Sequence, residues 1–142
     1  MKRFTLAILV VAILVVPGAG LAKGPKAPTS PKKCVAHAVS YRVAGNLESG
    51  SLTLNSDGTY SGSLVVDVKK TNRHAKADEG TTVTYTLTSA KLKLHGEDPS
   101  ALTANSRVKL KGTITTLAKK CDQTGFTPTV TIKRGTVKPP KA

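Results

Sequence analysis

Apolar residues recur at every second position in several separate segments of this chain, and this alternation limits the fold more than any other feature. In the first segment one face carries Val35, His37, Val39, Tyr41 and Val43. The pattern returns in four later segments, at 60–68, 83–87, 108–114 and 130–132. Such alternation is typical of strands with one buried face, and no segment keeps a helical period. The sequence therefore predicts an all-β fold.

The order of these segments predicts a barrel. Asn55-Ser56-Asp57-Gly58 is a strong hairpin signal, because Asp-Gly suits a turn that needs positive φ. We expect a long first strand interrupted at 45–50, a three-strand meander, a short separate arm at Leu92–Leu94, and a final two-stranded unit. This layout favours a small five- to six-stranded Greek-key barrel, OB-like, with a small β-sandwich as the alternative.

The first 22 residues have the features of a secretory signal peptide. Lys2 and Arg3 form a basic start, Phe4–Val16 is an apolar run, and small residues precede a cleavage site near Ala22. The apolar run is shorter than the about 20 residues that a membrane-spanning helix needs. We therefore expect a secreted protein, extracellular or periplasmic after cleavage.

The mature chain is expected to hold one domain between two flexible tails. Residues 23–33 are rich in Lys and Pro, and residues 137–142 repeat this composition at the other end. Neither stretch has an apolar period, so both should remain solvated. The predicted domain spans 34–136, a length typical of a single domain.

Part of the chain resembles a known group of proteins. The segment Ser106–Ile114, with Gly112 inside a strand pattern, and the segment Lys119–Phe126 are similar to small secreted bacterial proteins with an OB-like β-barrel and no assigned chemistry. The resemblance covers about 34–137. It implies the barrel and export, and it assigns no catalytic or binding residue.

The two cysteines of the chain, Cys34 and Cys121, are predicted to form a disulfide. An exported chain meets an oxidising compartment, and there is no Cys-x-x-Cys spacing that would favour redox or metal chemistry. The bridge would join the start of the first strand to the loop after the fourth, and in an OB layout those two strands are neighbours. The chain-entropy model gives such a bridge a ceiling of about 4.6 kcal/mol.

No motif of catalysis or cofactor binding is present. The sequence has no Gly-x-Ser-x-Gly elbow, and its carboxylates lie mostly in expected turns. The histidines His37, His74 and His95 lack the spacing of metal ligands. Glu97-Asp98 offers too few carboxylates for a calcium loop. We expect no enzyme, no catalytic residue, no cofactor and no metal.

Positive charge is the one functional signal. The chain has 22 Lys and Arg against 8 Asp and Glu, a net charge of +14 that becomes +12 once Lys2 and Arg3 are removed. A basic strip attracts polyanions by releasing their counter-ions. The residues predicted to bind anions are Lys69, Lys70, Arg73, Lys76, Arg107, Lys109, Lys111, Lys119 and Lys120.

Two functions fit this charge. The first is an exported binding module that contacts an anionic polymer, glycan or membrane surface. Specific nucleic-acid binding is not expected, because single strands are held on exposed aromatic side chains and the tyrosines fall in buried registers. The alternative is a structural or protein-interaction domain with a protein partner, in which the charge serves only solubility.

Overall fold

The computed structural model describes residues 34–142, so the predicted signal peptide and the tail at 23–33 lie outside the described residues. Among the described residues, no helix is long and apolar enough to cross a membrane. The structure consists of five strands and one short 3-10 helix. Their bounds are β1 His37–Leu54, β2 Tyr60–Thr71, η1 Arg73–Asp78, β3 Thr82–Leu94, β4 Arg107–Thr116 and β5 Val130–Lys138.

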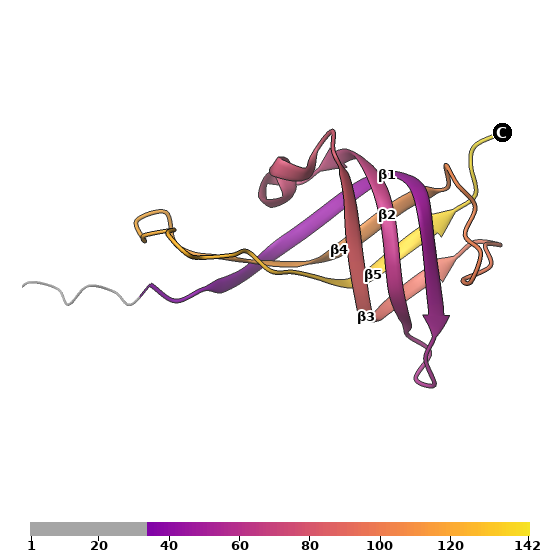
Figure 1. Ribbon diagram of the computed structural model, residues 1–142, viewed down its shortest axis with the longest axis horizontal. Helices are drawn as coiled ribbons and strands as arrows, with labels where there is room; N and C mark the ends of the chain where they lie inside the picture. Colours follow the sequence, from indigo (N-terminus) through magenta and orange to yellow (C-terminus); the bar gives the residue numbers. More distant parts are fainter. Residues whose placement is uncertain (1–33) are drawn as a thin grey trace, which may run out of the picture. The chain divides into compact units, whose positions relative to one another are not determined.

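The five strands form one sheet that closes on itself in the order β1-β2-β3-β5-β4 (Figure 1). Every pairing is antiparallel except that between β3 and β5, which is parallel. The prediction of an all-β fold with a small Greek-key, OB-like barrel is confirmed. The loop between β3 and β4 contains no helix.

The first strand closes the barrel because it pairs with two other strands, β4 and β2. Its first half pairs with β4 and its second half with β2, and register shifts at Ala44/Gly45 and Leu47/Ser49 bend it between them. The predicted interruption at 45–50 is therefore wrong, since bulges bend the strand without ending it. Gly45 is required at the first bend, because a Cβ there would lie 2.0 Å from the carbonyl oxygen of Asp67.

The core fills the barrel with inward side chains from all five strands. The largest fully buried residues are Tyr41, Leu47, Leu64, Leu110, Val66, Val68, Val108, Val137 and Ser106. The first segment departs from its predicted face, because Val35 is 69% exposed and His37 is also exposed. This end of β1 continues beyond the barrel into an arm (Figure 1), where it pairs with β4 and faces no core.

Three predicted boundaries are corrected. Leu92 and Leu94 do not form a separate arm but extend β3, where they pair in parallel with β5. The domain continues past 136, because Val137 is fully buried and β5 ends at Lys138. The polar, basic composition of 69–80 predicts a loop over that whole range, but Lys69 and Lys70 belong to β2.

The predicted disulfide between Cys34 and Cys121 is present, with the sulfur atoms 2.18 Å apart and the Cα atoms 5.7 Å apart. It joins the residues just before β1 to the loop between β4 and β5. In Figure 1 both segments run out from the barrel as one arm. The bridge therefore fastens the arm and lies outside the barrel core.

Candidate anion-binding groove

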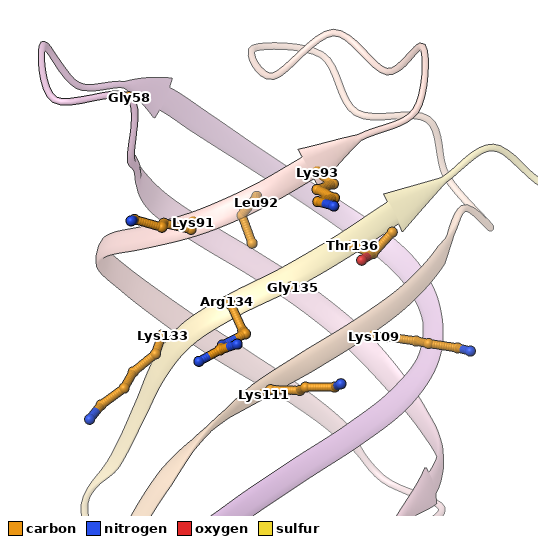
Figure 2. Close-up of a pocket in the computed structure, with 10 residues that line it drawn as sticks. All are labelled: Gly58, Lys91, Leu92, Lys93, Lys109, Lys111, Lys133, Arg134, Gly135 and Thr136. Atoms are coloured by element: carbon orange, nitrogen blue, oxygen red, sulfur yellow. The ribbon is translucent and has the colours of Figure 1, made fainter.

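A hollow of about 850 Å³ runs along the outside of β5, between β3 and β4. Figure 2 shows Lys91 and Lys93 on β3 at one side of β5, and Lys109 and Lys111 on β4 at the other. We call this hollow the β5 groove. Its lining residues are Gly58, Lys91, Leu92, Lys93, Lys109, Lys111, Lys133, Arg134, Gly135 and Thr136.

Strand register arranges the cations of the groove in rows. Lys111 and Lys91 both pair with Arg134, one from β4 and one from β3. On the far side Lys111 also pairs with Arg42 of β1, so four cations occupy one row across four adjacent strands. Because neighbouring strands lie about 4.8 Å apart, these charges are brought close together by the backbone itself.

Two further rows follow the first. Lys109 and Lys93 both pair with Thr136. Arg107 pairs with Lys138, and these two residues line a smaller hollow of about 240 Å³ with Lys109 and Thr136. Successive rows are two residues apart along a strand, which is about 7 Å. The outward positions of β4 alternate with the buried Val108 and Leu110, as the sequence predicts.

No negative charge offsets these rows from within their strands. Strands β3, β4 and β5 hold eight Lys and Arg residues and no Asp or Glu. In the described part of the chain, ion pairs involve Lys69 with Asp67 at 2.6 Å and Lys76 with Glu79 at 2.8 Å, both outside the groove. Hydrogen bonds from Thr59 lower the pKa of Asp57, and the positive charge of Lys91 adds to this effect.

The structure divides the predicted anion-binding residues into two groups. Lys109 and Lys111 of β4 line the groove, and Arg107 on the same strand lines the smaller hollow beside it. Lys70 lies on β2 and reaches a neighbouring hollow of about 250 Å³ that Arg42, Lys109 and Lys111 also line. The remaining predicted cations lie elsewhere: Lys69 in β2, Arg73 and Lys76 in η1, and Lys119 and Lys120 in the loop between β4 and β5.

Sequence reasoning missed four of the six cations that line the groove, and Lys138 beside it. Lys91, Lys93, Lys133, Arg134 and Lys138 were not predicted as site residues, yet they supply the β3 and β5 cations. A local signal existed, because Lys91 and Lys93 have the same alternate spacing as the β4 cations. What places them beside Arg134 is the parallel pairing of β3 with β5, which joins segments far apart in the sequence.

A second polar cluster lies at another part of the barrel. The Tyr41 hydroxyl donates to Asp78 Oδ2, and the hydroxyl oxygens of Tyr41 and Tyr85 are 2.9 Å apart. Burial, followed by the hydrogen bond to Asp78, raises the pKa of Tyr41 far above its usual range. Tyr41 therefore keeps its proton at neutral pH. The cluster ties η1 to the barrel and borders a hollow of about 330 Å³.

The carboxylates of the described residues do not gather into a metal site. Glu97 accepts hydrogen bonds from Ser106 Oγ at 2.6 Å and from the Thr103 backbone N–H at 2.9 Å, so both its oxygens are engaged. Asp98 accepts from Ser100. Among residues 34–142, no three His, Cys, Asp or Glu side chains lie close enough to hold an ion.

Comparison of the chain with models of protein families, with curated proteins and with solved structures finds no match. The groove itself is therefore the feature from which a function can be inferred. The groove is cationic: Gly135 and Thr136 of β5 form its floor, and lysines line both of its sides. Of the aromatic side chains at 34–142, none lines it.

Proposed function

We propose that this chain is an exported binding module whose β5 groove holds an anionic polymer of the envelope or the extracellular space. The observation that carries the proposal is the set of register-paired cations on β3, β5 and β4, without a carboxylate on those strands. Like charges placed directly across a sheet destabilise it. A polyanion would relieve this repulsion and release its own counter-ions.

Export is part of the same proposal. The disulfide between Cys34 and Cys121 is compatible with an oxidising compartment, where such bridges persist. The predicted signal peptide supports the same location. Polyanions available there include phosphodiester polymers, acidic glycans and anionic lipid surfaces.

The test is a salt titration of the oxidised chain from Lys23 onward against a phosphodiester polymer, an acidic glycan, duplex DNA and anionic vesicles. We expect a marked preference for one polymer that persists at about 0.15 M salt, where the Debye length is about 8 Å. Equal weak binding to all four, lost together as salt rises, would contradict the proposal.

A matched pair of variants locates the binding. The groove variant replaces Lys91, Lys93, Lys109 and Lys111 with Ser, and the control variant replaces Lys69, Arg73, Lys119 and Lys120 with Ser. Both lose four positive charges, so a purely global charge effect would weaken binding equally. We expect the groove variant alone to lose most of its affinity.

A protein-interaction domain is the second candidate, and one observation favours it. Within β3, residues 82–90 pair with β2 alone, and within β5, residues 130–132 pair with β4 alone. These two strand edges face a hollow of about 410 Å³ lined by Thr and Ser side chains together with Val130, Ile132 and Lys133. An extended peptide can add to such an edge through backbone hydrogen bonds. Binding of this kind would persist at salt well above physiological concentration.

A further inference from the structure

We infer that the β5 groove holds a linear phosphodiester chain lying along β5, held from both sides at two successive positions and contacted at a third, just beyond the groove, by cations of β4 and β5. This inference rests on the proposed function and adds the class of polymer and its orientation. The three positions are the paired rows described above: Lys91 with Arg134 and Lys111, Lys93 with Thr136 and Lys109, and Arg107 with Lys138.

The dimensions of the groove select a single chain. Its walls, β3 and β4, are two strand spacings apart, which is about 10 Å. A duplex is too wide to enter, because its major groove alone is about 12 Å across. The rows repeat about every 7 Å along β5. A chain that carries one anionic group at each such step can engage every row.

The two-sided placement of the cations favours phosphodiesters over carboxylates. A phosphodiester has two non-bridging oxygens that point to opposite sides of the chain, so a lysine on β3 and a lysine on β4 can each hold one. A carboxylate on a sugar projects from one side of its chain, and both its oxygens face the same wall. Charge-assisted hydrogen bonds to phosphate are strong for both Arg and Lys.

The groove is suited to the backbone of the chain and not to attached bases. Stacking on an aromatic side chain contributes about 1–3 kcal/mol per base in single-strand binding proteins. The described aromatic residues Tyr41, Tyr60, Tyr85 and Phe126 do not line the groove. An abasic chain should therefore bind as tightly as one with bases.

The experiment titrates the oxidised chain from Lys23 onward with abasic deoxyribose–phosphate oligomers that carry two, three, four or six phosphates. Each phosphate up to the third should raise the affinity by about three- to tenfold, the effect of two exposed ion pairs. Affinity should rise little beyond three. A steady rise through six phosphates would overturn the inference, as would tighter binding of oligothymidylate by tenfold or more.

Two comparisons test whether lysines of both β3 and β4 hold the chain. An oligogalacturonate with the same number of charges should bind at least about tenfold more weakly than the phosphate oligomer at the same salt concentration. Removing either wall, by Lys91→Ser with Lys93→Ser or by Lys109→Ser with Lys111→Ser, should abolish this preference. Lys119→Ser with Lys120→Ser removes two charges outside the groove and should preserve it.

The outcomes separate the inference from the proposed function. If phosphate and uronate oligomers bind equally, or if the one-wall variants keep the preference, the inference is wrong and the polyanion-binding function stands. If neither polymer binds at about 0.15 M salt, both fail. If the control variant loses as much affinity as the groove variants, the charges act as a diffuse field and the groove is not the site.

Discussion

At the scale of single residues, Glu97 shows how a carboxylate can hold a long loop in place. It lies buried in the loop that joins β3 to β4, and both its oxygens accept hydrogen bonds from the part of this loop that leads into β4. The hydrogen bond from Ser106, and then that from the Thr103 backbone, lower the pKa of Glu97 below its ordinary value of 4.5. Its ionised form is thus favoured in the folded state.

This lowered pKa makes stability depend on pH in a defined direction. A carboxyl whose pKa falls on folding stabilises the protein above its unfolded value and loses that contribution as pH falls through the folded value. We predict that Glu97→Gln lowers the free energy of unfolding at pH 7, and that the difference from the native chain shrinks as pH falls below 4.5. Urea unfolding at pH 7, 5, 4 and 3 measures this.

The matched control is Glu48→Gln, which changes an exposed carboxyl on β1 that accepts one hydrogen bond from Thr82. The free energy of unfolding of Glu48→Gln at pH 7 should stay within about 0.5 kcal/mol of the native value. A difference between Glu97→Gln and the native chain that stays constant down to pH 3 would contradict the assigned role of the Glu97 carboxylate.

The Tyr41 hydroxyl gives a second prediction at this scale. Tyr41→Phe keeps the buried ring but leaves Asp78 without its donor and Tyr85 without its partner. Loss of a partner for partly buried polar groups costs about 1–3 kcal/mol. We expect the urea midpoint of Tyr41→Phe to fall accordingly, and that of Tyr60→Phe, whose ring is only partly buried, to stay near the native value.

At the scale of strands, the cation rows lower the stability of the sheet at the surface where binding is proposed. Lys111 of β4 lies between Arg42 of β1 and Arg134 of β5, with like charges directly opposite on both sides. In such pairs the Cβ atoms are about 4.5–5.5 Å apart. Sites that evolve for binding commonly carry strain of this kind.

We predict that Lys111→Thr makes the barrel more stable while weakening its binding of polyanions. Removing two cross-strand repulsions and adding a β-branched residue should raise the free energy of unfolding by about 0.5–1 kcal/mol at low salt. The gain should shrink as added salt screens the native repulsion. Urea unfolding at low and high salt, beside a polyanion titration, checks both parts.

Lys69→Thr is the control for this prediction, because Lys69 is an exposed strand lysine that pairs with Asp67 at 2.6 Å. Its replacement removes an attraction and should bring no gain in stability. If Lys111→Thr were no more stable than Lys69→Thr at low salt, repulsion within the cation rows would not destabilise the fold.

The strands also show what sequence alone can predict. Alternation identified the inward residues of β2 and β4, such as Leu64, Val66 and Leu110, because a strand's period of two is a local property. The pairing of β3 with β5 is not local. It depends on how β1 bends and on the long loops around β4, so the row that unites Lys91 with Arg134 could not be read from either segment.

At the scale of the whole described chain, the disulfide and the groove are separate features. The bridge fastens an arm outside the core, and no groove residue belongs to the loop that carries Cys121. The bridge therefore stabilises the fold mainly by restricting the conformations of the unfolded chain. In that chain it closes a loop between cysteines that are 87 residues apart in the sequence.

We predict that replacing both Cys34 and Cys121 with Ser lowers stability while leaving polyanion affinity within about twofold of the native value. The chain-entropy model sets a ceiling of about 4.6 kcal/mol on the loss in the free energy of unfolding. Urea unfolding of the variant, and of the native chain with and without reductant, gives the loss by two routes that should agree. Binding is then measured below the unfolding midpoint. A folded variant with strongly reduced affinity would mean that the arm takes part in binding, because the groove lies on strands that the bridge does not touch.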